Sequence, residues 1–412
     1  MRADFLVPAE PASRAEARLN LFDRFLSDRL QRRLRPGRIG LELWDGSSPP
    51  GQPGAPVGQL VVRDRRALAG LVLNPDLYFG EVYMSGRVQV RGDFFGVIEG
   101  LSRLSTPTGP SPRERIALWT SRAADLGAAR RNIQHHYDLG NDFYDLWLDS
   151  QLVYTCAYYP TAGATLEEAQ VAKLDLVCRK LALRPGDRVI EAGCGWGALA
   201  LHMARHYGAT VRAFNISTEQ IQFARERAAR EGLTDRVEFI DEDYRNVAGR
   251  CDVFVSVGML EHVGRSNFDA LSAVIRRTLD RNTGRGLLHF IGRDRPRPLN
   301  AWIRRRIFPG AYPPSLTEVS QYVLEPADLS VVDVENLRPH YARTLADWRH
   351  RFEAAESHVS VQFGDAFYRA WRLYLAGSQA AFSTGWMQLF QIVFQPSGAP
   401  LLRWTRDGLY SD

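Results

Sequence analysis

The sequence predicts an α/β protein in which a mostly parallel sheet carries helices on both faces, preceded by a smaller N-terminal α+β domain. Short apolar runs separated by helix-length segments support the sheet; they are "DRVIEAGCG", "ATVRAFNIS", "RVEFIDEDY", "CDVFVSVGM" and "GLLHFIG". Buried parallel strands read as continuous apolar runs, and their alternation with helices is typical of βαβ units. A length of 412 residues also favours two domains over one.

The N-terminal domain is expected over residues 1–112. Residues 17–35 are predicted to form a helix, because apolar residues recur near helical spacing at Leu19, Phe22, Phe25, Leu26 and Leu30. We favour packing of this helix on its own domain, and a helix lying on a membrane surface is the alternative. "IGLELWDG" and "GQLVVRD" are expected to be strands. A linker rich in turn formers at about residues 104–115 leads to a second domain over 113–412.

Composition limits the cellular compartment and the partners that we expect for the protein. The cysteines show no CxxC or zinc-type spacing and no signal peptide is evident, so we expect a reduced cytoplasmic protein without a metal site; they are Cys156, Cys178, Cys194 and Cys251. No apolar run reaches the roughly 20 residues that a membrane helix needs. The net charge is +5 and arginine dominates it. Because arginine suits phosphate, nucleic acid and an anionic lipid surface both remain as partners at this point.

A glycine-rich turn follows the first apolar run of the sheet, in "VIEAGCGWGALALHMARHYG". Gly193, Gly195 and Gly197 remove Cβ atoms where backbone approaches a ligand, and the next helix offers unpaired N–H groups. The same glycines satisfy the dinucleotide pattern. The second run, however, ends at Asn215 instead of an acid, and the third ends in "DEDYR", which can meet an adenine ring. This combination favours S-adenosylmethionine over a nicotinamide cofactor.

Ordered blocks then carry a family resemblance from about residue 130 to the C-terminus. They are "NIQHHYDLGNDFYDLWLD", "YTCAYYP", "EAGCGWG", "ISTEQ", "VGMLEHVG", "LLHFIG", "IFPGAYPPSL", "LRPHYARTLADW" and "WRLYLAGSQAAF". With them the chain resembles the cyclopropane-fatty-acid synthases, including the mycolic acid cyclopropane synthases. The resemblance implies a Rossmann-like class I methyltransferase sheet. "GEVYMSGRVQVRGD" in the N-terminal part resembles the lipid-handling domain of longer members.

The resemblance implies that a methyl group passes from S-adenosylmethionine to the cis double bond of a phospholipid acyl chain, after which a proton is lost and a three-membered ring closes. The cofactor residues that it implies are Tyr154, Thr155, Gly193, Cys194, Gly195, Trp196, Gly197, Asn215, Ile216, Gln220, Tyr244 and Arg245. It also implies a bicarbonate ion as the base. The holders of that ion would be Cys156, Glu261, His289, the backbone of Ile291, and Tyr341. Tyr137 is our candidate to stabilise the cation on the lipid, with Tyr158 and Tyr159 as others.

Simpler interpretations stand beside these roles. A lone buried cysteine such as Cys156 is usually a small apolar residue, and His289 alone would usually be a core residue. Glu261 is different, because an acid after an apolar strand needs a partner or water. We expect both Glu261 and His289 at carboxyl ends of strands, where sheets of this type place their sites. His262 is expected to be a structural hydrogen-bonding residue.

Several functions remain after this step. The preferred one is cyclopropane formation on unsaturated phospholipid, and the alternative gives a methyl-branched, methylene or furan-precursor chain. A non-catalytic lipid carrier is disfavoured by the complete glycine turn, and a nucleic-acid methyltransferase by the dispersed charge. We therefore expect no nucleic-acid partner, a peripheral contact with the inner face of the membrane, and a possible homodimer.

Overall fold

The computed structural model describes residues 18–50, 55–104 and 139–410. The domain boundary expected at 112/113, nearly all of the predicted linker, and Tyr137 lie outside these residues. Contacts between Cα atoms divide the chain into two compact units. The first contains Met1–Gly109, Asn300–Pro309 and Leu345–Trp386, and the second contains Pro110–Leu299, Gly310–Thr344 and Met387–Asp412.

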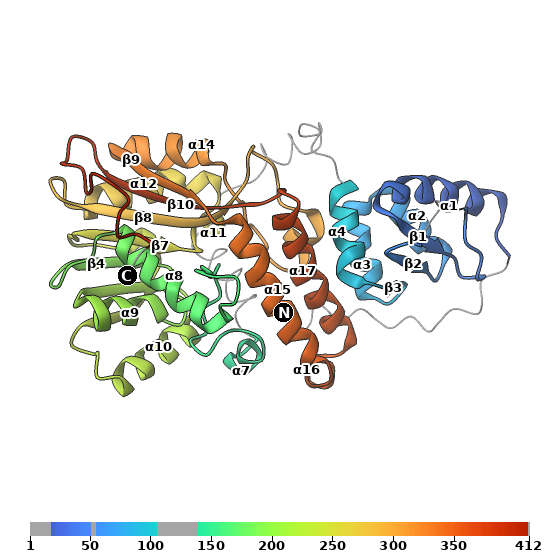
Figure 1. Cartoon of the computed structure of the whole chain (residues 1–412), viewed down its shortest axis with the longest axis horizontal. Helices are drawn as coiled ribbons and strands as arrows, with labels where there is room; N and C mark the ends of the chain where they lie inside the picture. Colours follow the sequence, from blue (N-terminus) through green and yellow to red (C-terminus); the bar gives the residue numbers. More distant parts are fainter. Residues whose placement is uncertain (1–17, 51–54, 105–138, 411–412) are drawn as a thin grey trace. The chain divides into compact units, whose positions relative to one another are not determined.

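The second unit is built on a seven-stranded sheet with the strand order β6-β5-β4-β7-β8-β10-β9 (Figure 1). Neighbours from β6 to β8 pair in parallel, whereas β10 pairs antiparallel with both β8 and β9. The strands are β4 (Arg188–Ala192), β5 (Thr210–Asn215), β6 (Val237–Asp241), β7 (Val253–Val257), β8 (Arg285–Gly292), β9 (Leu329–Asn336) and β10 (Gln388–Pro396). The predicted α/β fold is confirmed, and the five predicted apolar runs are β4 to β8.

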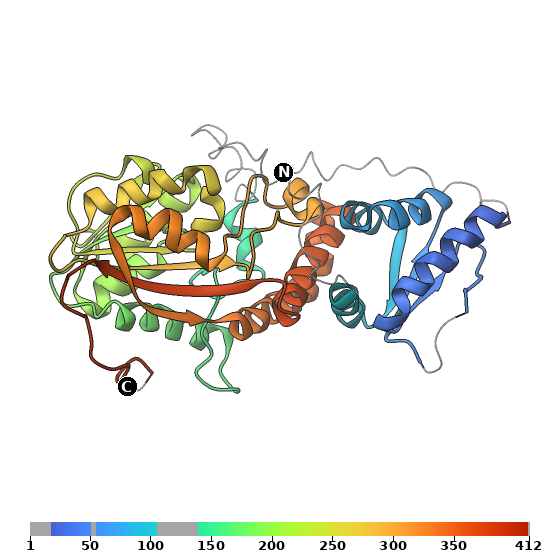
Figure 2. The same cartoon turned by 90° about the horizontal axis from the view of Figure 1, so that it is seen from above.

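Helices cover both faces of this sheet (Figure 2). They include α7 (Asn141–Asp145), α8 (Leu166–Lys180), α9 (Ala198–Tyr207), α10 (Thr218–Arg230), α11 (Leu260–Val263), α12 (Phe268–Thr278), α14 (Leu316–Val319), the π-helical η5 (Ser320–Leu324) and the start of α15 (Arg338–Ala354). Short 3₁₀ turns lie at η3 (Tyr244–Asn246), η4 (Arg265–Asn267) and η6 (Glu325–Ala327). α8, α9 and α10 share one apolar cluster with the strands, and α12 and η5 share the other.

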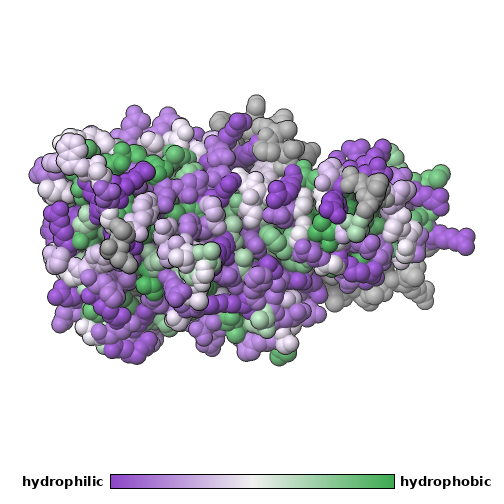
Figure 3. Space-filling model, viewed as in Figure 1, coloured by the Kyte–Doolittle hydropathy of each residue, from purple (hydrophilic) through white to green (hydrophobic). Residues whose placement is uncertain are grey.

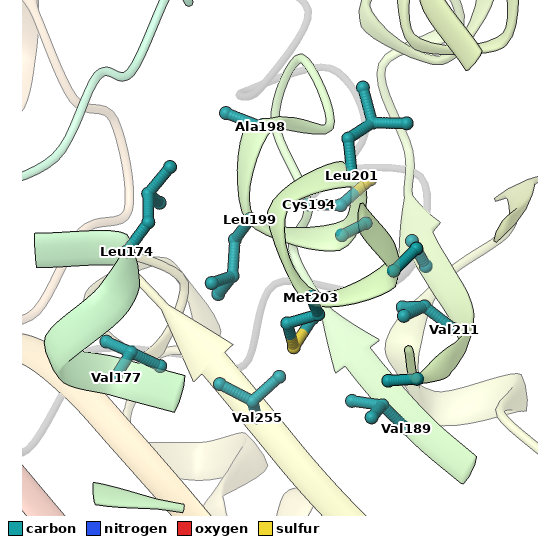
Figure 4. Packing of buried hydrophobic residues seen from close by; sticks show 14 of the residues in the cluster. Leu174, Val177, Val189, Cys194, Ala198, Leu199, Leu201, Met203, Val211 and Val255 are labelled. Atoms are coloured by element: carbon teal, nitrogen blue, oxygen red, sulfur yellow. The ribbon is translucent and has the colours of Figure 1, made fainter. Parts of the chain in front are cut away.

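The first of these clusters explains why the sheet forms here. Every residue of β7, "VFVSV", is buried, as expected for a central parallel strand covered on both faces. Figure 4 shows Leu199 and Met203 of α9 packed over Val189 and Val255 of the neighbouring strands. A capping box starts α8, in which Glu168 Oε2 accepts from the Thr165 N–H at 2.8 Å. Packing and capping together fix α8 beside the sheet.

Two strands of the seven-stranded sheet were not predicted. β9 and β10 lie at the antiparallel end of the sheet, and all nine residues of β10 are buried. Three glutamines interrupt the apolar pattern of β10, which masks the strand; they are Gln388, Gln391 and Gln395. Because these amides find hydrogen-bond partners, the strand is buried despite its polarity.

The first unit holds a three-stranded sheet of β1 (Ile39–Glu42), β2 (Gly58–Val62) and β3 (Val88–Gly92), in that order. Its helices include α1 (Leu21–Leu34), α2 (Arg65–Leu73), α3 (Pro75–Met84), α4 (Phe94–Leu104), α13 (Ala301–Arg306), α16 (Glu356–Phe363) and α17 (Asp365–Ser383), with a 3₁₀ turn η2 (Arg35–Gly37) after α1. The strands predicted from "IGLELWDG" and "GQLVVRD" are β1 and β2.

The predicted N-terminal helix, α1, packs on its own unit as we favoured. Leu26, Leu30 and Leu34 are buried in the core of this unit. Phe22 and Phe25, which the helical spacing grouped with them, are instead 60 % and 55 % exposed. Phe22 lies one helical turn before the buried Leu26, so helical spacing does not separate the two, and only part of the predicted apolar face is core. In the described part of the chain, no helix combines the length and apolar character needed to cross a bilayer.

Candidate active site

The glycine turn between β4 and α9 has the geometry that its sequence predicts. Gly193, Gly195 and Gly197 have φ values of 87°, 53° and 84°, a region that favours glycine. A Cβ on Gly193 would lie 2.9 Å from Met259 Cβ, and one on Gly197 would lie 2.6 Å from Phe239 Cζ. A Cβ on Gly195 would meet no atom of the described residues within 4 Å. Two of these glycines are therefore required by packing, and the third faces open space that a ligand can use.

Asn215 at the end of β5 ties the turn to α10. Its Nδ2 donates to Gln220 Oε1 at 2.7 Å and to the Gly195 carbonyl at 3.3 Å. The N–H groups of Gly193 and Cys194 donate to the Phe214 carbonyl at 2.9 and 3.1 Å. β5 therefore holds the turn in place through the backbone carbonyl of Phe214 and the side-chain amide of Asn215.

A pocket opens beside the turn, at the carboxyl ends of the parallel strands. Its volume is about 480 Å³, including open solvent, and its lining is Gly193, Phe214, Asn215, Ile216, Glu242, Asp243, Tyr244, Arg245, Met259, His262, Val263 and Asn267. The predicted cofactor residues in this lining are Gly193, Asn215, Ile216, Tyr244 and Arg245. The other predicted cofactor residues do not line it; they are Tyr154, Thr155, Cys194, Gly195, Trp196, Gly197 and Gln220.

The pocket wall formed by η3 offers one buried polar atom. The Tyr244 hydroxyl has no hydrogen-bond partner among the described residues, and burial raises the pKa of Tyr244. Arg245 is held by Asp243, with N···O distances of 2.7 and 2.9 Å. Met259, Val263 and Asn267 were missed by sequence reasoning. The available signal was their position in the segment that follows β7, since an α/β sheet places ligands at the carboxyl ends of its strands.

Tyr154 and Thr155 lie in a segment tethered to α8 and to an aromatic cluster. The Lys173 ammonium donates to Thr155 Oγ1 at 2.7 Å, and Gln170 Nε2 donates to the Thr155 carbonyl at 2.9 Å. The Tyr154 ring lies 5.6 Å from that of Tyr144. The ring of Tyr144 is 5.0 Å from that of Trp196, in the glycine turn. These contacts join the "YTC" segment to the cofactor turn.

Cys156 is buried next to the start of α15. Its thiol donates to the Ala157 carbonyl at 3.1 Å and lies 4.0 Å from the carbonyl of Leu337. Burial raises the pKa of Cys156, so the thiol keeps its proton. The Ala157 N–H donates to Thr344 Oγ1 at 3.1 Å, which fixes this segment against α15. Tyr341, in the first turn of α15, is buried, and its N–H donates to the Leu337 carbonyl at 3.1 Å.

Backbone contacts connect Leu337, beside Cys156, to Ile291 near the end of β8. The Leu337 N–H donates to the Leu389 carbonyl at 2.8 Å, and Leu389 pairs with Ile291 across β10 and β8. The backbone N–H of Ile291 in turn acts on the carboxyl of Glu261 and opposes the rise of its pKa. Three of the predicted holders of the anion, Cys156, Ile291 and Glu261, are therefore linked by these contacts, although they come from separate parts of the sequence.

Glu261 lies on α11, just after β7, as predicted. Its side chain is buried, and burial raises the pKa of Glu261 to about 7. Oε2 is buried without a hydrogen-bond partner among the described residues. Such a carboxyl can carry a proton near neutral pH and donate it in a hydrogen bond.

His289 lies inside β8, and the expectation that it ends a strand is wrong. It pairs with Val257, the last residue of β7, and its carbonyl accepts from the Gly258 N–H at 2.8 Å. β8 runs three residues beyond this level, so His289 is still level with the carboxyl end of β7. Its Nδ1 lies 3.0 Å from Gln391 Nε2, and its Nε2 is buried without a partner in the described residues.

Lys173 and Glu191 are buried charged groups that attract each other. Burial lowers the pKa of Lys173 and raises that of Glu191, and attraction between the two groups opposes both shifts. Burial also lowers the pKa of His289 well below its usual range, with Lys173 and Lys180 contributing in the same direction. The imidazole of His289 is therefore neutral.

A doubly wound sheet, a glycine turn without a ribose-binding acid after β5, and a pocket at the strand ends define a Rossmann-like methyltransferase. The family model described as "Mycolic acid cyclopropane synthetase" matches residues 125–392, and the chain belongs to this family.

Relatives support the same assignment. A "Probable fatty acid methyltransferase" of Pseudomonas putida is 38 % identical over 387 residues, which are 90 % of this chain and 96 % of that protein. The "Cyclopropane-fatty-acyl-phospholipid synthase" of Escherichia coli K12 is 41 % identical over 268 residues, 63 % of this chain and 66 % of that one. A crystal structure of the mycolic acid cyclopropane synthase CmaA1 complexed with SAH and CTAB is 31 % identical with a TM-score of 0.61, covering 65 % of this chain and 98 % of that chain. The protein is an S-adenosylmethionine-dependent methyltransferase of the cyclopropane synthase type.

Proposed function

We propose that the enzyme adds a methylene group from S-adenosylmethionine to the cis double bond of an unsaturated phospholipid acyl chain, with a bound bicarbonate ion as the base. One observation carries this proposal. Glu261 Oε2, on α11 just after β7, and His289 Nε2, on the neighbouring strand β8, are both buried and both lack a partner in the described residues. Buried polar atoms of this kind are costly unless a ligand satisfies them.

The residues fit a small anion. A neutral imidazole can donate from one nitrogen, and a carboxyl whose pKa lies near 7 can donate while protonated. The buried Cys156 thiol remains protonated, so it adds no negative charge to the site. Bicarbonate bound here would supply a base for a proton released by the lipid. The protein's own residues would orient that ion without competing for the proton.

The chain's other contribution is to align the reactants and exclude water. Holding reactants in line can account for about 7–11 kcal/mol of a barrier. The bond between sulfur and methyl would break as the methyl bonds to one alkene carbon, which releases S-adenosylhomocysteine. Transfer of a proton from that methyl to the base would then close the ring. The positive charge that develops on the lipid needs a face that does not attack it, and aromatic rings supply one. Tyr137 stays our proposal for this contact. Tyr159 is less suited, because the Arg343 guanidinium already lies 4.0 Å from its ring centre.

A second product class is favoured by one observation. The Pseudomonas putida relative, which matches along 90 % of this chain, is named a fatty acid methyltransferase. The same site could end the reaction with a methyl-branched, methylene or furan-precursor chain if the proton left from another carbon. Product structure, as opposed to turnover, separates the two.

A membrane surface is the proposed source of the lipid. α1 exposes Leu21, Phe22 and Phe25, at 84 %, 60 % and 55 %. Exposed arginines alternate with them along the same helix; they are Arg24, Arg29, Arg32 and Arg33. An apolar stripe beside arginines suits an anionic bilayer surface. On the face shown in Figure 3, hydrophobic residues lie in groups among hydrophilic ones. A homodimer stays a prediction, which sedimentation of the purified chain would test.

Lipid analysis tests the proposed function. The purified protein would be incubated with S-adenosylmethionine, bicarbonate and liposomes of unsaturated phospholipid, followed by mass spectrometry of the acyl chains. We expect acyl chains heavier by one CH₂ unit and without the double bond. An unchanged acyl profile in the presence of all components would contradict the proposal.

A further inference from the structure

A buried row of polar side chains crosses the antiparallel end of the seven-stranded sheet. His289 on β8 pairs with Gln391 on β10, and Gln391 pairs with Glu335 on β9. Residues that pair directly across strands project to the same face of a sheet. Lys180, the last residue of α8, joins this row because its Nζ donates to Gln391 Oε1 at 2.6 Å and to Glu335 Oε2. Four elements thus contribute to one connected row.

The row is unusual for its position in the core. Gln391, His289 and Lys180 are 0 %, 2 % and 3 % exposed. Burying a lysine and a glutamine in a sheet is costly unless their hydrogen bonds serve a purpose or are fully satisfied. Neither residue belongs to the cofactor pocket, and neither was assigned a role by the family resemblance.

The donor and the acceptor of each hydrogen bond in this row can be assigned from the chemistry of the side chains. A lysine ammonium can only donate, so it must meet the oxygen of the Gln391 amide. The amide NH₂ is then turned to His289 Nδ1, 3.0 Å away. An NH₂ group can also only donate, so Nδ1 must carry the lone pair. In a neutral imidazole the single proton is then on Nε2.

We propose that Lys180 and Gln391 are positioning residues that hold His289 as the neutral imidazole protonated at Nε2, so that this N–H donates to the anion of the base site. The inference rests on the proposed function, because it explains how one holder of the anion is prepared. Its main support is the geometry of the row, together with the buried Nε2 that lacks a partner in the described residues. Burial and the positive charges of Lys173 and Lys180 lower the pKa of His289 and so keep the ring neutral.

The reaction needs this tautomer. A neutral N–H donor orients a basic anion and leaves its basicity largely intact. The other tautomer would present a lone pair to the anion, and a charged imidazolium would share its proton with it. A partner that fixes the tautomer of a functional histidine is a common arrangement around metal ligands, and the same logic applies to an anion.

The tautomer can be measured without any turnover. Wild-type protein labelled with ¹⁵N-histidine would be examined by NMR, and the His289 signals identified by their loss in His289→Asn. We expect a proton on Nε2 and none on Nδ1. In Gln391→Glu, the new carboxylate can accept from Lys180 and also from the ring, so we expect a proton on Nδ1.

Gln395→Glu is the matched control. Gln395 is a buried glutamine on the same strand, but it binds the Pro400 carbonyl and the Leu402 N–H. This variant should leave the His289 tautomer as in wild type. If Gln391→Glu does not fold, Lys180→Met gives a second test, because releasing the amide oxygen should give a mixture of the two tautomers.

Activity then adds an independent readout. Gln391→Glu should lower kcat by about 10- to 100-fold while KM for S-adenosylmethionine stays within about twofold, as expected for a residue that acts through another. A proton on Nδ1 of wild type overturns the inference, even if lipid turnover is normal. An unaltered tautomer and kcat in Gln391→Glu overturns it as well. If the wild-type tautomer is as expected but no lipid is modified, the proposed function fails and the positioning of His289 stands.

Discussion

The thiol of Cys156 donates to the carbonyl oxygen of Ala157 at 3.1 Å, inside a fully buried site. Because burial raises the pKa of this thiol, it is not a thiolate and is poorly suited to act as a nucleophile. Cys156→Ser keeps a small donor in the same place, so we expect it to lose less than about tenfold in turnover. Turnover of labelled S-adenosylmethionine on unsaturated liposomes measures this.

Cys251→Ser makes the same change at a buried thiol beside the amino end of β7, and serves as the control. Complete inactivity of Cys156→Ser, together with a covalent acyl adduct on the wild-type protein, would restore a nucleophilic role for this cysteine.

Glu261→Gln should be far more damaging to activity than Cys156→Ser. The variant keeps the shape of the side chain but loses the carboxyl that we assign to the anion. We expect turnover to fall by about 10²- to 10⁴-fold, the usual range for proton-transfer chemistry. Binding of S-adenosylhomocysteine, measured by calorimetry, should change little. Turnover near the wild-type level would show that Glu261 does not belong to the base site.

The same variant should become relatively more stable as pH rises. The pKa of Glu261 is raised to about 7 in the folded state from an ordinary value near 4.5. A carboxyl with a raised folded pKa binds its proton more tightly when folded, so the native state loses stability as pH rises from about 4.5 to about 7. Glu261→Gln removes that loss, and its unfolding free energy should gain on wild type by about 2 kcal/mol between pH 5 and pH 8.

Denaturant unfolding at the two pH values measures this difference. Glu226→Gln, an exposed change on α10, is the control and should show no such trend. A constant difference between Glu261→Gln and wild type at both pH values would mean that Glu261 is not a destabilised carboxylate.

Substitutions at two glycines of the cofactor turn, Gly195 and Gly197, should impair the protein in different ways. Gly197→Ala places a Cβ 2.6 Å from Phe239 Cζ at a φ of 84°, so it should lose about 2–4 kcal/mol of unfolding free energy. The new Cβ of Gly195→Ala meets no atom within 4 Å in the part of the chain that the structure describes, so its main effect should be on the ligand. We expect S-adenosylhomocysteine binding to weaken by more than about tenfold, or about 1.4 kcal/mol.

Calorimetry and denaturant unfolding of both variants test this separation. Normal ligand binding by Gly195→Ala would mean that the cofactor does not approach the turn at that residue.

The exposed phenylalanines of α1 predict how the enzyme reaches its lipid. Replacing Phe22 and Phe25 by serine should weaken binding to anionic phospholipid vesicles by about tenfold or more, because the apolar contact is lost. Val361→Ser on α16 removes a residue that is 90 % exposed and should have no such effect. Vesicle sedimentation measures both. Equal binding by the double variant and wild type would place the membrane contact elsewhere.

Local pattern was enough to predict the parallel part of the sheet. β4 to β8 coincide with short, mainly apolar runs, of which β7 is wholly buried, and Glu261 could be singled out because an acid follows β7. β10 was not predicted, because its glutamines break the apolar pattern that a buried strand normally shows. Their burial depends on partners from other strands and helices, which no local pattern contains.

The tautomer of His289 also could not be predicted from local sequence pattern. Lys180 and Gln391 are 211 positions apart in the chain, and only the fold brings them together. Single-sequence reasoning could assign a role to His289 through a family motif, but the tautomer depends on hydrogen bonds made across three elements. Likewise, helical spacing grouped Phe22 with Leu26, and only tertiary packing decided which of the two is buried.

The fate of the transferred methyl group tests the central claim most directly. The protein would be incubated with S-adenosylmethionine carrying a trideuterated methyl group, bicarbonate and liposomes of unsaturated phospholipid, and the acyl chains analysed by mass spectrometry and NMR. We predict a cyclopropane ring that retains two of the three deuterium atoms, since the proton taken by the base comes from the transferred methyl. Acyl chains that retain all three deuterium atoms, or that remain unmodified, would contradict the account.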